Sequence, residues 1–397
     1  MAQRHHDLTE PAAGAGPALG SARAGGPPGG DALAGYLRDQ ATDFLRALRL
    51  HRETGGGTSS SNGPAAVGSS SRGTAEGAQD EVDAARALRR TARRISGSLH
   101  TFRPLLDPDW SEQIRPELAW LSGTLALEHA YAARLERLLL ALHRLSGSSV
   151  VPPQTEPAAG GRPGAAAPAA RKPVSGTVGR PTQPAPAPDR GNLTVGAAKA
   201  GALLDRQLTL ARTRAHSTAL QALGSSRFHA VADKVAVLAS EVPLTAAAPA
   251  TDLRPLAAAA EERLADAVSA LPLITAGSPY NAEALVHGLS PDPAPHPQDA
   301  PWHQVRLLLR LHRYACEVLR GRGAPLDMRL ITAGQALDRH RDASEAAAAA
   351  AQAARTPRIA PATAYALGVL HADQRHEVEA ARYAFQRCWQ KQTVGTP

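Results

Sequence analysis

The chain has 397 residues, of which 43% are hydrophobic and only 4% aromatic, so a substantial aliphatic core can form. Its formal net charge is +8, and nearly all of the positive charge is arginine. The two cysteines form no CxxC motif, which argues against a disulfide framework. The N-terminal segment has no apolar signal-peptide core, and no apolar run is long enough to span a membrane. We therefore expect a cytoplasmic protein with no membrane partner.

Low-complexity stretches divide the chain. Residues 1–30 are rich in Gly, Ala and Pro and predict a disordered N-terminal tail. Residues 31–397 predict one helical domain. Two stretches rich in Gly, Ser, Pro and Ala, at 54–79 and 147–192, predict disordered linkers within this domain.

The remaining segments carry helical spacing of apolar residues, and none alternates apolar and polar residues as a strand does. The abundance of Ala, Leu and Arg favours helix as well. The segment 111–145 could form one helix or two. Helices are expected over 31–54, 80–102, 111–145, 193–240 in two pieces, 253–270, 281–288, 302–322, 326–354 and 361–392. The predicted fold class is all-α.

A weak internal repeat is present in the two halves of the chain. Arg89-x3-Arg93 in the first half aligns with Arg306-x3-Arg310 in the second, preceded three residues earlier by Arg86 and His303, respectively. Repeats of this kind predict structurally similar units. We therefore expect two pseudo-symmetric helical bundles that face each other.

The helix expected at 80–102 carries a dense arginine stripe. No carboxylate follows Asp83 until Asp107. Like charges at i,i+4 spacing repel, so an unneutralised stripe is typical of an anion site, although a solvated surface face is the alternative. The stripe comprises Arg86, Arg89, Arg90, Arg93 and Arg94.

A second stripe lies on the helix expected at 302–322. Glu317 is the single acidic residue in this helix, so the stripe is again largely unpaired. A partly charged imidazole can join an anion site. The candidate residues here are His303, Arg306, Arg310 and Arg313, with the hydroxyl of Tyr314 beside them.

Two carboxylates follow in the segment LDRHRDA (337–343). Asp342 could hold an arginine in position across the bundle, or it could form an ordinary ion pair. For Asp338 we expect an ordinary ion pair on the helix surface, which contributes little to stability.

Motifs for catalysis are missing from the sequence. It contains no GxSxG, GxxxxGK[ST] or HExxH motif, and no acidic cluster that would hold Mg²⁺. The histidines do not fall at zinc-ligand spacing. We therefore expect a binding protein rather than an enzyme, with no metal and no cofactor.

In its arginine stripes and the segments around them, the sequence resembles the CHAD family, the conserved histidine α-helical domain. The resemblance runs from about residue 32 to 389 outside the two linkers. It rests on the Arg89-x3-Arg93-Arg94 spacing and on the ordered segments LAGYLRDQ (33–40), TFRPLLDP (101–108), WHQVRLLLRLHRYACEVL (302–319) and LDRHRDA (337–343).

The resemblance implies two helical bundles around a basic central cleft that binds inorganic polyphosphate, in a protein associated with polyphosphate granules. The implied ligand-contacting residues are Arg89, Arg93, Arg94, His303, Arg306, Arg310, Arg313 and His340. Arg86 stands where the family has its first histidine, and Leu307 and Leu311 stand at positions that are often basic. The basic lining is therefore thinner than is usual for the family.

Three other functions fit parts of the sequence. A nucleic-acid binder agrees with the pI of about 10.0, but stacking aromatics are few and no helix-turn-helix motif is present. A degenerate family member acting as a protein-interaction scaffold agrees with the lost histidine. An enzyme acting on phosphoanhydrides or nucleotides lacks the carboxylates that would hold its metal.

Overall fold

The computed structural model describes residues 29–56, 70–147, 188–278, 281–289, 296–321, 325 and 327–390. Within these ranges the chain is all-α, as predicted, and forms no strand beyond one isolated bridge between Leu106 and Leu244. The α-helices are α1 (Gly29–Gly56), α2 (Ser70–Thr101), α3 (Pro108–Leu145), α4 (Pro188–Leu223), α5 (Ser226–Ser240), α6 (Arg254–Ser269), α7 (Leu273–Ala276), α8 (Ala282–Gly288), α9 (Ala300–Arg320), α10 (Met328–Ala354) and α11 (Pro361–Gln390). The 3₁₀ helices are η1 (Arg103–Leu105), η2 (Ala248–Ala250) and η3 (Pro297–Asp299).

Helix bounds differ from the predicted ones next to the linkers. The linker predicted at 54–79 is wrong at both ends, because α1 continues to Gly56 and α2 already begins at Ser70. The linker predicted at 147–192 likewise ends early, because α4 begins at Pro188. Once a helix has nucleated, each added residue gains a hydrogen bond, so weak helix formers can extend it. The rest of both linkers, and residues 1–28, lie outside the described residues.

Helix α3 forms a single long rod rather than two pieces. Asp107 caps its N-terminus, where the carboxylate accepts a hydrogen bond from the backbone N–H of Trp110 at 2.8 Å, and Pro108 occupies the first turn. Pro116 lies inside the helix without ending it. The short helix α7 was not expected from the sequence.

The apolar side chains gather in three separate cores. The first joins α1, α2, the start of α3 and α5 around Phe44, Ile95 and Phe228, which are 0–1% exposed. The second joins the end of α3, the start of α4, the end of α10 and the start of α11. The third joins α6, α9, the start of α10 and the end of α11 around Trp302 and Phe385. Burial of these side chains is the main force holding the helices together.

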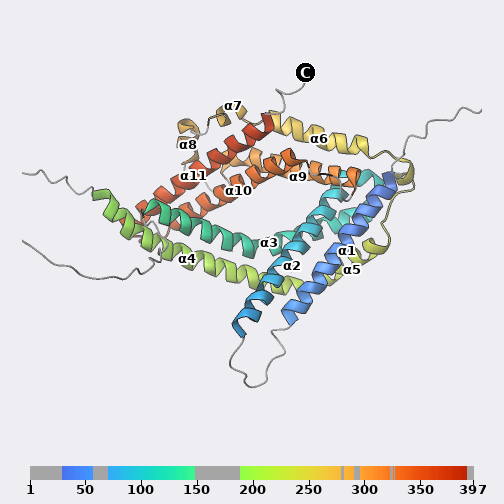
Figure 1. Ribbon diagram of the computed structural model, residues 1–397, viewed down its shortest axis with the longest axis horizontal. Helices are drawn as coiled ribbons and strands as arrows, with labels where there is room; N and C mark the ends of the chain where they lie inside the picture. Colours follow the sequence, from blue (N-terminus) through green and yellow to red (C-terminus); the bar gives the residue numbers. More distant parts are fainter. Residues whose placement is uncertain are drawn as a thin grey trace, which may run out of the picture.

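Long helices connect the cores. In Figure 1, α3 and α4 run together along one side of the molecule, whereas α10 and α11 run together along another. Helices α1 and α2 lie side by side, and α9 lies between α2 and α10, in contact with both. This arrangement brings the two segments that carry the predicted stripes into contact. The pseudo-symmetry of the two halves stays a prediction.

A glycine allows α2 and α9 to approach each other closely. A Cβ added to Gly97 of α2 would lie 2.6 Å from Cδ2 of Tyr314 and 3.3 Å from a methyl carbon of Leu311, both on α9. Tyr314 is only 6% exposed, so its ring has little room to move. Gly97 therefore sets the short distance between the two arginine-bearing helices.

Candidate anion-binding site

Arginines from α2 form one side of the candidate site. Arg89 and Arg93 have no carboxylate within ion-pair distance among the described residues. Burial lowers the pKa of Arg89, and the charges of Arg341 and Arg86 lower it further. Burial together with the charge of Arg89 lowers the pKa of Arg93 to about 10. These side chains therefore lie in a strongly positive environment, and a bound anion would reduce the repulsion between their charges.

Helix α9 supplies the opposite side. Burial, and then the charge of Arg310, lower the pKa of Arg306 to about 10. The pKa of Arg310 is also lowered, chiefly by burial and in part by the charge of Arg93 on α2. Arg89 and Arg93 of the first stripe therefore lie close enough to Arg306 and Arg310 of the second for their charges to influence one another. Asp338 of α10 accepts a hydrogen bond from Nε of Arg306 at 2.5 Å and lies 3.9 Å from Nη2 of Arg310.

Two further arginines, which the sequence analysis did not single out, lie near those of α2 and α9. Arg341 of α10 is bonded to Asp342 and lies 3.8 Å from Glu345. Arg134 of α3 donates a hydrogen bond to Oε2 of the same Glu345 at 2.5 Å. We use the name arginine cluster for Arg86, Arg89, Arg93, Arg134, Arg306, Arg310 and Arg341.

Arg86, at the edge of the arginine cluster, is partly neutralised. Its guanidinium donates to Asp83 at 3.0 Å and lies 3.4 Å from Nδ1 of His129 on α3. Burial, followed by the charge of Arg86, lowers the pKa of His129, which favours the neutral imidazole there. Arg86 therefore links α2 to α3 at the end of the cluster.

A cavity of about 1020 Å³ opens beside the arginine cluster. One part of its wall carries His303, Arg306, Arg341 and Arg134. The rest combines several alanines of α10 between 347 and 354 with polar side chains that include Glu345 and Arg375. Burial lowers the pKa of His303, so its imidazole is mostly neutral at pH 7. The cavity has room for an extended anion beside the guanidinium groups.

Two of the candidate residues, Arg94 and Arg313, point elsewhere, whereas Tyr314 also interacts electrostatically with Arg93 and Arg310 of the arginine cluster. Arg94 donates to Glu317 at 2.9 Å, Arg313 lies 3.6 Å from the same carboxylate, and Tyr314 is a buried ring 5.9 Å from both guanidiniums. Tyr36 of α1 also donates to Glu317, at 2.9 Å. Arg94 and Arg313 line a second cavity, of about 940 Å³, between α1, α2, α9 and α10.

Helix geometry explains the division of the first stripe. At about 100° per residue, Arg89 and Arg94 lie about 140° apart around the axis of α2, so they cannot face the same ligand surface. Arg86, Arg89 and Arg93 face the arginine cluster, whereas Arg90 and Arg94 line the second cavity. The sequence spacing alone was too permissive, because i,i+3 and i,i+4 steps drift in opposite directions.

His340 lies in the protein interior, 1% exposed, and does not line either cavity. Its ring stacks on Trp302 with 5.6 Å between the centroids, and Nε2 accepts a hydrogen bond from Nε of Arg382 at 3.3 Å. Burial lowers the pKa of His340 to about 4. A contact between this imidazole and a ligand in the cavity would require the side chain to move.

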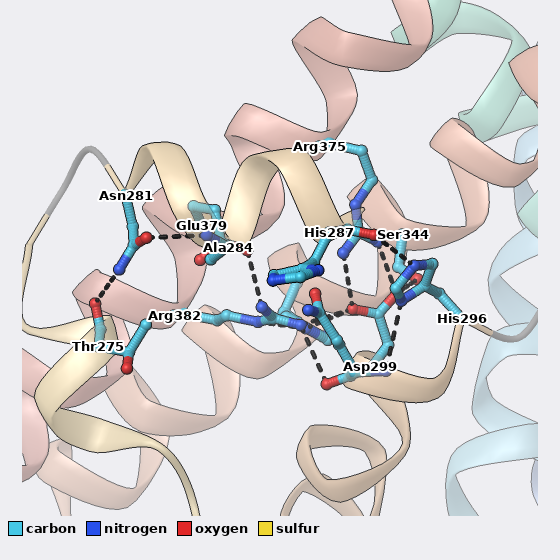
Figure 2. Close-up of polar contacts among 12 residues, drawn as sticks. Thr275, Asn281, Ala284, His287, His296, Asp299, Ser344, Arg375, Glu379 and Arg382 are labelled. Carbon is cyan, nitrogen blue, oxygen red and sulfur yellow. Dashed lines mark hydrogen bonds and ion pairs between the residues drawn. The ribbon is translucent and has the colours of Figure 1, made fainter. Parts of the chain in front are cut away.

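Beneath the cavity lies a buried ionic network that the sequence reasoning missed. Asp299, at the start of α9, is 0% exposed and is shared by two arginines of α11. Arg375 donates to it at 2.7 Å and 3.2 Å, and Arg382 donates to it at 2.7 Å. Figure 2 shows the two guanidiniums reaching Asp299 from different directions, with Ser344 of α10 also bonded to it. The network ties α9 to α10 and α11.

Charge is balanced in this network. Burial alone would raise the pKa of Asp299, but the neighbouring His340 and Arg375 hold it well below its usual range. Glu379 accepts from Arg382 at 2.7 Å, and its own pKa is raised by burial. We call Asp299, Glu379, Arg375 and Arg382 the buried network. No sequence motif marks it, because Asp299 and Arg375 are 76 positions apart.

The part of the chain that the structure describes contains no group of three or more His, Cys, Asp or Glu that could hold a metal ion. None of the helices in those ranges combines the length and the hydropathy that a membrane crossing requires. The arginine cluster presents guanidinium groups, which bind oxyanions through charge-assisted and bidentate hydrogen bonds.

The described part of the protein is all-helical and carries a cluster of arginines between its helices. The family model of the CHAD domain matches residues 70–351, and the chain belongs to that family. It is similar to PptA from Streptomyces chartreusis, with 65% sequence identity. The match covers 91% of this chain and 99% of that chain, with a TM-score of 0.67. No curated protein matches the sequence.

Proposed function

We propose that the protein is a non-catalytic, cytoplasmic module that binds inorganic polyphosphate through the arginine cluster. Membership of the CHAD family supports polyphosphate as the ligand class. The observation that carries the proposal is the meeting of Arg89 and Arg93 with Arg306 and Arg310 while the α2 pair lacks a carboxylate partner within the described residues. A chain of linked phosphates would supply the missing negative charge at several points at once.

The proposed mechanism is multivalent. Each guanidinium can donate two parallel hydrogen bonds to phosphate oxygens, and it stays charged at neutral pH even with a pKa near 10. After the first contact, the next phosphates of the same chain are held close to the remaining arginines, so their binding becomes intramolecular. Affinity is therefore expected to increase with chain length.

Binding of long-chain polyphosphate at low and at moderate salt tests the proposal. Displacement of counterions from a polyanion makes affinity fall steeply as salt increases. We expect tight binding at low salt, a strong loss at moderate salt, and poor competition by duplex DNA. Absence of binding at low salt would refute the function, and equal competition by DNA would favour a nucleic-acid binder.

A further inference from the structure

Three carboxylates form a row along the side of α10 that faces the arginine cluster. Asp338, Asp342 and Glu345 are four and three residues apart, so they share one stripe of the helix. Their side chains are 54%, 47% and 41% exposed. We call these residues the carboxylate row. Solvent, and an incoming anion, can therefore reach all three.

Each member of the carboxylate row is in contact with the cluster. Asp338 bonds to one guanidinium of α9 and lies near a second, Asp342 bonds to Arg341, and Glu345 bonds to Arg134 of α3. These arginines are more buried than their partners, with side-chain exposures between 16% and 30%. The carboxylate is thus the more solvent-exposed partner in each of these pairs.

Apart from Arg86, which pairs with Asp83, and Arg310, which lies 3.9 Å from Asp338, the arginine cluster is of two kinds. Arg89 and Arg93 on α2 are partly buried, and no carboxylate among the described residues pairs with them, so we call them the open arginines. Arg134, Arg306 and Arg341 are occupied by the carboxylate row. An anion that reaches the open arginines has no carboxylate to displace there. To engage the occupied ones it must displace carboxylates and remain close to their negative charge.

A ligand's charge and length decide whether displacement is favourable. An exposed ion pair contributes about 0–1 kcal/mol, so a single pair can be broken by a strong competitor. A short phosphate held by the open arginines has few charges left with which to displace the rest. A long chain brings further phosphates at high local concentration once its first contact is made. Competition with the carboxylate row therefore weakens short anions more than long ones.

We infer that Asp338, Asp342 and Glu345 are specificity-determining residues that select long polyphosphate chains over short phosphates. The inference rests on the proposed function. It differs from a purely structural role in the sign of its effect. Carboxylates that merely hold arginines in position would increase affinity for every phosphate, whereas a competing row reduces affinity, most strongly for short ligands.

Neutralisation of the row tests the inference. The triple variant Asp338→Asn, Asp342→Asn and Glu345→Gln is compared with the native protein in calorimetric titrations with tripolyphosphate and with long-chain polyphosphate, at one fixed low salt concentration. We expect the affinity for tripolyphosphate to increase about tenfold, which corresponds to about 1.4 kcal/mol. The affinity for the long chain should change by less than about threefold, so the preference for long chains falls.

A matched control removes the same three charges elsewhere. The control variant is Asp252→Asn, Asp266→Asn and Glu117→Gln. Asp252 lies just before α6 and pairs with Arg254, Asp266 lies on α6, and Glu117 lies on α3 and pairs with Arg227. The control should change both affinities by a similar, small factor. If the control increases the affinity for tripolyphosphate as much as the row variant does, the effect comes from net charge and the inference fails.

Two results separate this inference from the proposed function. In the first result, the native protein binds long-chain polyphosphate, but the row variant keeps the same preference for long chains or binds both probes more weakly. This result overturns only the specificity role of the carboxylate row. Native protein that binds neither probe at low salt removes the proposed function and this inference with it. Circular dichroism of each variant establishes that it is folded.

Discussion

Arginines of α11 and arginines of α2 carry the same charge but have opposite surroundings. Arg375 and Arg382 are 2% and 4% exposed and share Asp299, with Glu379 nearby. Arg89 and Arg93 are less buried and have other arginines, rather than carboxylates, as neighbours. The comparison indicates that the neutralisation of an arginine, more than its burial, distinguishes a structural role from a binding role.

The largest expected effect comes from breaking the buried network. Asp299→Asn leaves Arg375 buried without its counterion and leaves Arg382 with Glu379 alone. Removal of one partner from a buried ion pair typically costs about 3–5 kcal/mol. Urea unfolding should show a loss of that size. Asp338→Asn, in the exposed carboxylate row, should cost less than about 1 kcal/mol. Equal losses for the two variants would contradict the contrast between the two regions.

Protonation of His340 gives the second prediction. Its pKa is about 4 in the folded protein and near 6.5 in an unfolded chain, so the unfolded state binds more protons between these values. Stability is therefore lost as the pH falls from about 6.5 to about 4, by at most about 3 kcal/mol for this residue. The depressed pKa of Asp299 adds a further loss only below about pH 4.

His340→Gln checks the assignment, because glutamine keeps an acceptor for Arg382 but does not titrate. Urea unfolding at pH 7 and pH 4.5 should show a smaller pH-dependent loss in the variant than in the native protein. His229→Gln serves as the control, since this histidine is exposed. An unchanged pH dependence in His340→Gln would mean that other groups cause the acid sensitivity.

Removal of an open arginine should affect binding without reducing stability. Arg93→Gln deletes one charge-assisted contact to phosphate, worth about 1.5–3 kcal/mol, so polyphosphate affinity should fall by roughly tenfold or more. Thermal stability should be unchanged or slightly higher, because repulsion from Arg89 is relieved. Arg254→Gln, on an 82%-exposed side chain of α6, should change neither property. A drop in stability for Arg93→Gln would assign this arginine a structural role.

The smallest expected effect concerns the spacing of the two arginine-bearing helices. Gly97→Ala places a methyl group 2.6 Å from the ring of Tyr314, and overpacking of this kind usually costs about 1–3 kcal/mol. Because α2 and α9 must move apart, polyphosphate affinity should also fall modestly. Gly123→Ala is a suitable control, since no atom lies within 4 Å of its added Cβ. Equal behaviour of the two variants would show that helix spacing does not matter.

The helices were predictable from local properties of the sequence. Apolar periodicity and the abundance of Ala, Leu and Arg located α5, α6, α9, α10 and α11 to within about three residues, which reflects strong local preferences. The start of α2 at Ser70 was not predictable, because Ser and Gly are weak helix formers and the extension depends on the helix that follows.

The candidate site was predictable only in part. Arg89, Arg93, Arg306 and Arg310 were predicted because they form runs without nearby acids in the sequence, and their contact with a ligand stays a prediction. The contribution of Arg134 was missed, because its partner Glu345 is 211 positions away and pairs of this kind leave no local pattern. Tertiary pairing also changed the role of Asp338, which was expected to form an ordinary surface pair but bridges α10 to the arginines of α9.

The salt dependence of polyphosphate binding tests the central claim most directly, when the native protein is compared with the double variant Arg89→Gln, Arg93→Gln. If these two arginines contact phosphate, the slope of log affinity against log salt should be shallower in the variant by roughly two released counterions. Affinity at low salt should be lower as well. The same slope and affinity in both proteins would contradict the account, because the open arginines of α2 would then take no part in binding.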